Sequence, residues 1–568
     1  MQKKSLRRKG AALFGILGVL FVVVISVKVA SSQFVEGTNP NYEVGDWVSY
    51  TNSRYVRSLA VGNRFVYFAT TGGITRYDVF GNRWDVPFTT SDGLPENNIF
   101  AVAFDFASGS IFCTTPSALC VRDPASRRWQ NFRLDAIGVG KKAIRSIGFN
   151  SHHIYLMAYD HSLFRSSRDN FNFSAVASTG QNIASLKDSI QWCGQMAFTP
   201  MNLPNFLISG SLLFYPDKFH PYFEDVNGRD FKIPFYQEDP WQTLWLASWG
   251  LGAAKADMRT QVLETLPFGL LQNDVQAMAL SGNDFWFGGV GGDQPLKGVT
   301  LWNRGTGEWN YFEGRFLSGF RSDDVMAIAP AGRYVWFGTL DGLTRYDRKK
   351  NDWTSFTLFN GLSSNLIYDL IADSSGVWAA TDEGLDHVQV KSGKRDTLLV
   401  QHITKPQEKV SVYAIEKDGD LLWAATGYGV YVYNCSTRKG GYYYGADGPG
   451  NAPVTAVSVC GNEVWFGTRY GVEVFNKAEK KWLGPPERTI LSDLKPLALC
   501  ATPKAVWLGT TDGLYKFNRK KRYWKKFTPA DGLINRRVQA ILVDGDYVWL
   551  GTPDGVTRFY WNAPYRID

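Results

Sequence analysis

Short apolar runs, separated by tight polar turns, recur in the same order along most of the chain. One clear unit holds apolar runs at residues 325–329, 334–339, 343–346 and 353–356. Each run has the length and the β-branched or aromatic character of a strand. None of them continues into the 3.6-residue period that a helix of ten or more residues requires. The pattern therefore predicts four antiparallel strands in each unit.

The second run of the unit recurs at a nearly constant spacing. Its core reads Val-Trp-Phe-Gly-Thr at 335–339 and 464–468, and Val-Trp-Leu-Gly-Thr at 506–510 and 548–552. The aligned tryptophans stand 42 or 45 residues apart, at positions 336, 378, 423, 465, 507 and 549. Looser copies centre on Phe68, Phe112, Tyr155, Trp245 and Trp286. Four short strands in each such unit are typical of a β-propeller blade, so we expect an all-β fold of about 11–12 four-stranded blades.

The spacing predicts two consecutive propellers. Seven regular units predict a seven-bladed ring over residues 270–568, and five or six more divergent units predict a second propeller over 43–269. The stretch 160–245 breaks the pattern, which indicates an irregular insertion. A strand at 46–50 precedes the first unit, and such an orphan strand usually completes the last blade of a ring because it removes a free edge. One very large ring through all the units is the alternative.

The repeats resemble the two-component-regulator propeller family. The resemblance rests on the V-W-x-G-T-x-x-G-[LV] core and on the run W-x-x-[FY]-T-x-x-[DN]-G-L that follows it, as at 353–362 and 524–533. It covers most of residues 43–560, and the closest copies lie after 270. The resemblance implies a propeller that senses an extracytoplasmic ligand, in several cases a glycan. We expect no histidine-kinase part, because the blades run to the end of the sequence.

The positive charge of the chain is concentrated near its beginning. Six charges of the net +8 flank the apolar stretch 11–27: Lys3, Lys4, Arg7, Arg8, Lys9 and Lys28. The rest of the chain keeps a net charge of about +2, whereas a nucleic-acid-binding protein carries a basic face on its folded body. We therefore expect no nucleic-acid partner. Basic residues before an apolar run predict that residues 1–32 are a cleaved signal peptide or a retained membrane anchor, and both place the repeats in the periplasm, at the cell surface or outside the cell.

Cysteine and histidine patterns give no sign of a cofactor. Cys460 and Cys500 end equivalent strands in neighbouring units, where we interpret them as small core residues rather than as a disulfide. The chain has no C-x-x-C motif, and its six histidines are scattered, so we expect neither a metal nor another cofactor. Motifs of serine hydrolases, zinc proteases and calcium loops are also absent from the sequence. We name no catalytic residue.

One position of the repeat varies while its neighbours do not. Near the start of each innermost strand, the residue between two apolar positions changes in size and charge from unit to unit. Because these strand starts converge at the mouth of the central channel, we predict ligand-binding residues there: Arg57, Arg145, Gln276, Tyr368, Tyr413, Lys495 and Gln539. The alternative is that this position faces channel water and varies without constraint.

The linkers near these strand starts add polar side chains to the predicted mouths. The linker residues that we expect to bind are Asn98, Asp274, Asp324, Asn365 and Arg537. Amides and carboxylates beside tyrosines suit the hydroxyls and the apolar faces of sugars. The alternative is that asparagine and aspartate serve as ordinary turn residues.

Three functions remain open on the sequence. The leading hypothesis is a binding protein for a glycan or a small extracytoplasmic ligand at a channel mouth. The second is a scaffold that holds envelope protein partners in a membrane or secretion assembly. The third is a polysaccharide-active enzyme, since propeller enzymes assemble their sites from several blades and spacing alone does not exclude one.

Overall fold

The computed structural model describes residues 34–36, 42–176, 190–208, 210–292, 294–391, 397–404, 409–443, 449, 452–483 and 494–566. The expected signal peptide or anchor, residues 1–32, lies outside this part of the chain. Among the described residues, no helix is long and apolar enough to cross a membrane.

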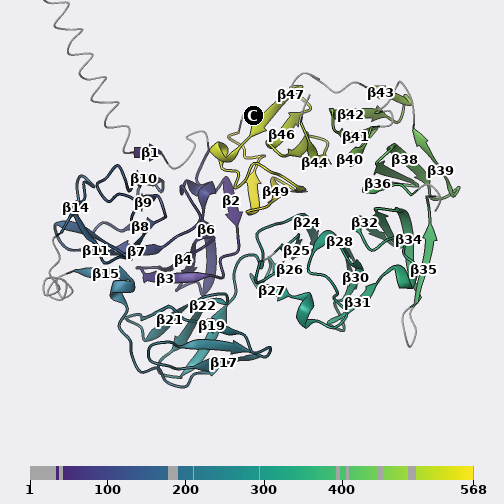
Figure 1. The fold of residues 1–568 in the computed structure, drawn as a ribbon. Helices are drawn as coiled ribbons and strands as arrows, with labels where there is room; N and C mark the ends of the chain where they lie inside the picture. Colours follow the sequence, from purple (N-terminus) through teal and green to yellow (C-terminus); the bar gives the residue numbers. More distant parts are fainter. Residues whose placement is uncertain are drawn as a thin grey trace, which may run out of the picture.

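The prediction of an all-β protein built from four-stranded antiparallel units is confirmed. The described residues form eleven sheets of four or five strands and one sheet of three strands. Helical structure described here is limited to short 3-10 turns, which are η1 (Thr90–Asp92), η2 (Gln195–Ala197), η3 (Gly314–Phe316), η4 (Leu358–Asn360) and η6 (Pro529–Asp531). Figure 1 shows the sheets as two groups that lie side by side.

Seven four-stranded sheets form what we call the C-terminal ring. In chain order its sheets are β24 (Ala277–Ser281), β25 (Asp284–Gly288), β26 (Val299–Asn303) and β27 (Trp309–Phe312); β28 (Val325–Ala331), β29 (Tyr334–Thr339), β30 (Gly342–Asp347) and β31 (Asp352–Phe356); β32 (Ile367–Asp373), β33 (Gly376–Thr381), β34 (Gly384–Lys391) and β35 (Thr397–His402); β36 (Val412–Asp418), β37 (Leu421–Thr426), β38 (Gly429–Asn434) and β39 (Lys439–Tyr443); β40 (Val454–Cys460), β41 (Glu463–Thr468), β42 (Gly471–Asn476) and β43 (Lys481–Leu483); β44 (Pro496–Ala501), β45 (Ala505–Thr510), β46 (Gly513–Asn518) and β47 (Tyr523–Phe527); and β48 (Ala540–Asp544), β49 (Tyr547–Thr552), β50 (Gly555–Tyr560) and β2 (Trp47–Tyr50).

The C-terminal ring closes on itself. The first strands of consecutive sheets contact each other, and β48 of the last sheet contacts β24 of the first. At this junction the Val275 amide donates to the Thr552 carbonyl oxygen at 3.0 Å. Strand β2 completes the last sheet by pairing antiparallel with β50, with Trp47 opposite Phe559. Among the described residues these seven sheets thus close without the remaining ones, and residues 47–50 pair within the C-terminal ring.

The remaining sheets form what we call the N-terminal group. Its sheets are β3 (Val56–Val61), β4 (Phe65–Thr70), β5 (Gly73–Asp78) and β6 (Arg83–Phe88); β7 (Ala101–Asp105), β8 (Ser110–Thr114), β9 (Ala118–Arg122), β10 (Trp129–Arg133) and β1 (Phe34–Glu36); β11 (Ile144–Phe149), β12 (His153–Ala158), β13 (Leu163–Ser167), β14 (Ser174–Ala175) and β15 (Gln191–Gly194); β20 (Phe235–Glu238), β21 (Thr243–Ser248), β22 (Gly252–Asp257), β23 (Val262–Leu266) and β16 (Leu207–Ile208); and the three-stranded β17 (Leu212–Tyr215), β18 (Tyr222–Asp225) and β19 (Asp230–Lys232). Strand β3 contacts both β7 and β21, and β7 contacts β11. The described residues thus give four blade-like sheets here, where the repeat count predicts five or six units.

Two recurring residues of the repeat, the threonine of its Gly-Thr pair and the glycine three residues later, shape the turn between the second and third strands. Thr339 accepts a hydrogen bond from the Asp341 amide at 3.1 Å and donates one to the Gly342 carbonyl at 2.8 Å. Gly342 has a φ of 105°, and a Cβ there would lie 2.3 Å from the Phe356 carbonyl oxygen of the fourth strand. Only glycine fits both constraints. The turn itself is Leu340-Asp341, since Gly342 already pairs with Thr339.

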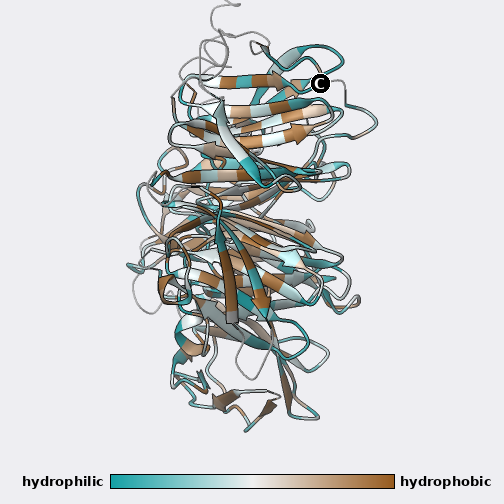
Figure 2. Ribbon diagram, turned by 90° about the vertical axis from the view of Figure 1, so that its right-hand side faces the viewer, coloured by the Kyte–Doolittle hydropathy of each residue, from teal (hydrophilic) through white to brown (hydrophobic). Residues whose placement is uncertain are grey.

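The sheets are held together by aromatic side chains that pack between neighbours. Along the strands, hydrophobic and hydrophilic residues follow one another (Figure 2). Trp507 is fully buried, and its hydrophobic cluster combines residues of its own sheet with Leu550 of the next sheet and Trp47 of β2. Trp47 stacks on Phe559 with 3.8 Å between ring centroids. Each sheet therefore buries its apolar faces only against the sheets beside it.

Two chain segments cross between the C-terminal ring and the N-terminal group, and they run side by side. The Leu270 amide donates to the Thr51 carbonyl at 2.9 Å, and the Asn52 side-chain amide donates to the Leu271 carbonyl at 2.8 Å. Arg54 is 6% exposed, donates to the Gly250 carbonyl at 3.0 Å and lies 4.3 Å from the ring centre of Tyr311. The paired crossovers fix the two groups relative to each other.

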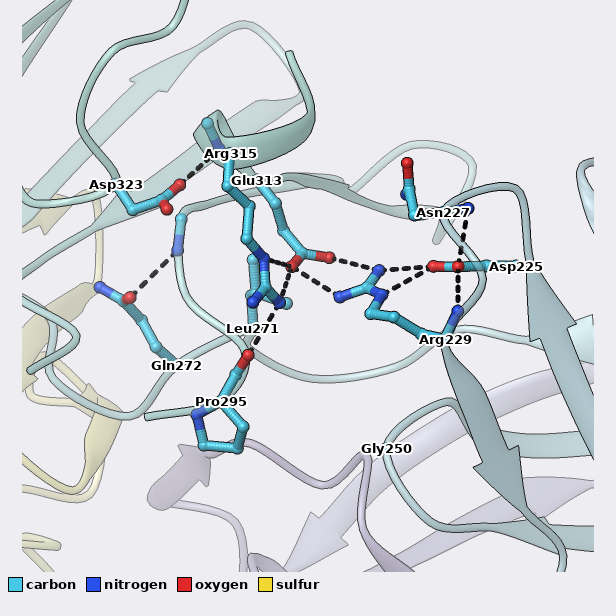
Figure 3. Close-up of polar contacts among 12 residues, drawn as sticks. Asp225, Asn227, Arg229, Gly250, Leu271, Gln272, Pro295, Glu313, Arg315 and Asp323 are labelled. Carbon is cyan, nitrogen blue, oxygen red and sulfur yellow. Dashed lines mark hydrogen bonds and ion pairs between the residues drawn. The ribbon is translucent and has the colours of Figure 1, made fainter. Parts of the chain in front are cut away.

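A charged network adds a second connection between the groups (Figure 3). Arg229, in the turn between β18 and β19, donates to Asp225 at 2.8 Å and to both carboxylate oxygens of Glu313 at 2.9 and 3.0 Å. Glu313 follows β27 and also accepts from Arg315 at 2.8 Å. Burial works to raise the pKa of Asp225, but the hydrogen bonds and the charge of Arg229 outweigh it, so the pKa lies below the ordinary value.

We predict that Arg229→Gln lowers the free energy of unfolding by about 2 kcal/mol, because Asp225 and Glu313 lose a charged partner while they remain largely buried. Thermal or denaturant unfolding measures the effect. The control is Arg259→Gln, which breaks an exposed pair with Asp257 and should change stability by about 0.5 kcal/mol or less. Equal effects of the two variants would contradict the role of the Arg229 network.

Candidate functional site

The variable position that the sequence singles out is a β-bulge. In several sheets the pairing of the first two strands skips one residue near the start of the innermost strand, and the skipped residues are Arg57, Arg145, Met326, Tyr368, Tyr413 and Thr455. An extra residue in a strand is released from the regular alternation and re-aims its side chain. Its freedom to vary in the repeat therefore has a structural cause.

Lys495 does not occupy this position. In its sheet the pairing skips Leu497, which lies between Pro496 and Ala498, whereas Lys495 precedes the strand and is exposed. The assignment of Lys495 to the variable position is wrong, because Pro496 takes the place that valine or isoleucine has in the other units. Gln276 and Gln539 directly precede their strands. Their backbone N–H groups donate hydrogen bonds to the carbonyl oxygens of Gly288 and Gly551, respectively.

Arg57 lies in a row of aromatic side chains in the N-terminal group, which we call the aromatic row: Tyr55, Trp249, Arg57, Phe100 and Tyr159. The rings of Tyr55 and Trp249 are 5.1 Å apart, and those of Phe100 and Tyr159 are 6.1 Å apart. The Arg57 guanidinium bridges the two pairs, at 5.3 Å from the ring of Trp249 and 5.2 Å from that of Phe100. Trp249 is 41% exposed and Tyr159 is 42% exposed, so solvent reaches both ends of the row.

Arg57 and Asn98, both predicted site residues, are in contact. Arg57 donates to the Asn98 side-chain oxygen at 2.7 Å and to the Ile99 carbonyl at 3.0 Å. Its pKa is below the ordinary value because burial disfavours the charged form. Among the described residues no carboxylate lies within ion-pair distance of Arg57. The positive charge at the centre of the row therefore has no carboxylate partner within the described part of the chain.

Arg145 lies beside the same turn that carries Tyr159. Its guanidinium is 3.0 Å from Nδ1 of His161 and 3.5 Å from the side-chain oxygen of Gln195. Its Nε is buried and has no hydrogen-bond partner among the described residues. Arg145 thus brings a second positive charge without a described carboxylate partner to this end of the N-terminal group.

Four other predicted residues meet where the C-terminal ring closes. Gln539 donates to Asp274 at 2.6 Å across the junction of the last and first sheets, and Arg537 donates to Gln539 at 3.0 Å. Burial raises the pKa of Asp274, against hydrogen bonds from Gln276 and Gln539 and the charge of Arg537. These side chains satisfy one another, and the cluster stabilises the closure of the ring.

Tyr368 and Tyr413 face each other on neighbouring sheets of the C-terminal ring, with 5.7 Å between their ring centres. Exposed tyrosines follow on the next turns, with Tyr428 at 59% and Tyr470 at 62%. Asn365 does not join them: it accepts from the Leu358 amide at 2.9 Å and donates to Asp341 at 3.1 Å. Asp324 likewise accepts from the Gly291 amide at 3.0 Å. Both side chains thus make hydrogen bonds within the protein.

Two partly buried carboxyl groups of the C-terminal ring were not singled out in the sequence. Asp369 accepts hydrogen bonds from the amides of Leu370 and of Ile415 on the next sheet, each at 2.8 Å. Burial raises the pKa of Asp369 to about 6 despite these bonds. Burial, and then the nearby charges of Asp369 and Asp418, raise the pKa of Glu416 to about 7.

We predict that the C-terminal ring loses stability as the pH rises from 5 to 8. A carboxyl whose pKa is raised on folding stabilises the protein below the unfolded pKa, and this contribution is lost as the pH rises through the folded value. Glu416→Gln removes the contribution of Glu416 to this loss, so the variant should be more stable than the parent by about 2 kcal/mol at pH 8 and by little at pH 5. The measurement is the free energy of unfolding of the parent, of Glu416→Gln and of the exposed-site control Glu238→Gln across this pH range. If the stability of the parent and of Glu416→Gln changed with pH in parallel, the prediction would be contradicted.

Trp249 and Tyr159 at the exposed ends of the aromatic row are not among the residues predicted from the strand starts. Trp249 and Tyr159 occupy the turns after β21 and β12, at the place where Leu340 stands in the regular unit. Alignment of these turns, rather than of the strand starts alone, would have shown aromatic residues there only in the divergent units. Among the described residues no group of three or more histidine, cysteine, aspartate or glutamate side chains is placed to hold a metal.

Comparison with solved structures finds similarity to PorZ of Porphyromonas gingivalis, an essential bacterial surface component of the type-IX secretion system. The two chains are 15% identical, the match covers 91% of this chain and 87% of PorZ, and the TM-score is 0.56. The extracellular domain of the putative hybrid two-component system BT4673 from B. thetaiotaomicron is 16% identical, over 90% of this chain and 71% of that chain, with a TM-score of 0.43. No family model and no curated protein matches the chain. The likeness to PorZ shows that this chain shares its fold.

Proposed function

We propose that this protein is an extracytoplasmic recognition module, a tandem propeller that binds a glycan at the aromatic row of the N-terminal group. The observation that supports the proposal best is the row itself. The guanidinium of Arg57 lies between the rings of Trp249 and Phe100, and Trp249 and Tyr159 expose aromatic faces along the row, a combination of apolar faces and a cation. Binding rather than catalysis is proposed, because no residues of the row form a nucleophile–base pair.

The chemistry of the row favours a sugar that carries an acidic group. Aromatic faces pack against the apolar faces of pyranose rings, while neighbouring polar groups bond the hydroxyls. Arg57 and Arg145 bring two guanidiniums without described carboxylate partners, and guanidinium groups bind carboxylate, phosphate or sulfate in paired hydrogen bonds. Tyr368 and Tyr413 offer a second, neutral aromatic surface on the C-terminal ring.

Two further observations support a place outside the cytoplasm, in the periplasm or at the cell surface. Basic residues followed by an apolar stretch at the start of the sequence are typical of an export signal or anchor. The shared fold with PorZ, a bacterial surface component, agrees with this placement.

The test compares Trp249→Ala and Tyr159→Ala with the parent protein, using acidic and neutral oligosaccharides in thermal-shift and calorimetric titrations. Each variant should weaken binding of an acidic oligosaccharide about tenfold, because each removes a stacking face. Arg145→Gln should weaken acidic oligosaccharides and leave neutral ones unchanged. The matched control is Phe359→Ala, which removes a fully exposed ring elsewhere.

Unchanged affinities in both aromatic variants would contradict binding at the aromatic row. Loss of binding in Tyr368→Ala and Tyr413→Ala instead would move the site to the C-terminal ring.

A scaffold function is the second candidate, and one surface favours it. The small sheet β17–β19 and the adjoining β16 expose large apolar side chains, with Leu207 at 69%, Leu213 at 58%, Phe219 at 63% and Val226 at 75%. Exposed apolar patches on soluble domains often mark protein contacts.

If the protein is a scaffold, the full chain should migrate as a complex when membranes are gently solubilised. Leu213→Ser with Phe219→Ser should release it, because the variant removes apolar contact area, while Trp249→Ala should not. Native gel electrophoresis reads the result, and a chain that migrates alone in all three forms would contradict the scaffold.

A further inference from the structure

A groove of about 930 Å³ lies where the N-terminal group meets the C-terminal ring. Its walls come from strands β6 and β23 on one side and from β26, β27 and the turn between them on the other. Tyr50 of β2 and the crossover residue Phe268 also line it. The groove is separate from the aromatic row, and its volume is in the range of sites that take small organic ligands, about 300–1,000 Å³.

Aromatic rings from both groups line the groove. Trp302 and Trp309 stack with 4.9 Å between ring centres and 4° between planes, and Tyr50 lies 5.2 Å from Trp302. From the N-terminal side, Trp84 packs on Phe268 at 4.8 Å, and Phe268 lies 5.4 Å from Trp309. Trp84 and Trp302 remain partly exposed, whereas the other three are buried. The rings of Trp84 and Trp302 therefore face the groove from its two sides.

Polar groups among these rings have no partner within the described part of the chain. Tyr50 is 5% exposed, and its hydroxyl makes no hydrogen bond to a described residue. The indole N–H groups of Trp84 and Trp302 also make none, although both line the groove. These three groups can therefore form hydrogen bonds with a ligand in the groove.

The charged side chains around the groove pair mainly with one another. Arg64 pairs with Asp78 at 2.7 Å, Arg304 with Asp544 at 2.6 Å, and Lys255 with Glu264 at 3.2 Å. Asp85 pairs with Arg76 at 3.1 Å. The rim also exposes the amides of Asn82 and Asn310. Such a rim offers many hydrogen bonds and little excess charge of either sign, in contrast to the aromatic row.

Trp302 also departs from the rule of the repeat. In each sheet, the second-strand residue just before the repeat tryptophan pairs with a residue of the third strand. In five other sheets of the ring this third-strand residue is tyrosine or phenylalanine: Tyr346, Tyr433, Phe475, Phe517 and Phe559. In the sheet that borders the groove it is Trp302, opposite Phe285. Since a smaller ring satisfies the packing in those sheets, the larger indole of Trp302 adds aromatic surface at the groove.

We infer that this groove binds a neutral oligosaccharide. Flat aromatic faces, unpartnered O–H and N–H donors and a rim of paired charges match the alternating apolar faces and hydroxyls of an uncharged sugar chain. The walls include the edge strands β6 and β27, where an extended peptide would be held by backbone hydrogen bonds, so a peptide is the competing ligand in the test. Because the walls belong to both groups, the bound sugar contacts the N-terminal group and the C-terminal ring at once.

The experiment titrates the full chain with neutral tetrasaccharides of glucose, mannose, xylose and N-acetylglucosamine, and follows tryptophan fluorescence and heat. Trp302→Phe restores the residue type of the other sheets, so it should fold normally, and it should weaken binding about tenfold. Asn310→Ala, on the exposed rim, should weaken binding about three- to tenfold through one lost hydrogen bond. The control Trp482→Phe removes a partly exposed tryptophan from a sheet away from the groove and should leave the affinity unchanged.

Each other outcome overturns the inference. No binding of any neutral tetrasaccharide, or binding that Trp302→Phe and Asn310→Ala leave intact, shows that the groove does not hold such a sugar. Binding that is lost only in Trp249→Ala assigns the sugar to the aromatic row. Displacement of the sugar by an extended peptide that binds more tightly makes the groove a peptide site.

Discussion

The architecture depends on the burial of tryptophan-bearing sheet faces between neighbouring sheets. No sheet of this size can cover both of its apolar faces alone, so the sheets must stack, and in the C-terminal ring the stack must close. Closure is completed by a strand from the other end of the described chain, β2, whose Trp47 packs on Phe559 and Phe527. Because the chain leaves β2 directly for the N-terminal group, ring closure also determines where that group lies.

This constraint brings the candidate sites together. The crossover that leaves β2 leads through Arg54, which packs between Gly250 and Tyr311, to Tyr55 and Arg57 of the aromatic row. The same crossover and its partner form part of the wall between the two groups, beside the groove. A change in the relative position of the groups would therefore alter the groove, and through Arg54 and Gly250 would also reach Trp249.

Much of the fold follows from the sequence, because each repeat contacts mainly its neighbours. The spacing of the tryptophans predicts the four-stranded sheets. The separate strand at 46–50, which precedes the first unit, predicts that the last sheet of a ring gains its fourth strand from the start of the repeats. The β-bulge gives a physical cause for the variable position, and Arg57 and Asn98 do meet. The alignment placed Lys495 at the variable position wrongly, because Pro496 stands where the other units have valine or isoleucine. Trp249 and the groove were missed because they arise from divergent turns and from contacts between the groups, where the repeat no longer specifies the partner.

Hydrogen–deuterium exchange of the folded protein, with and without an acidic oligosaccharide, tests the central claim most directly, since it locates a ligand without any substitution. The account predicts slower exchange in the segments around Tyr55–Arg57, Asn98–Phe100, Tyr159–His161 and Ser248–Gly250, with little change in β17–β19. These segments lie far apart in sequence, so their joint protection would require a ligand on the aromatic row. Protection confined to the C-terminal ring, or no protection at a saturating concentration, would contradict recognition at the aromatic row.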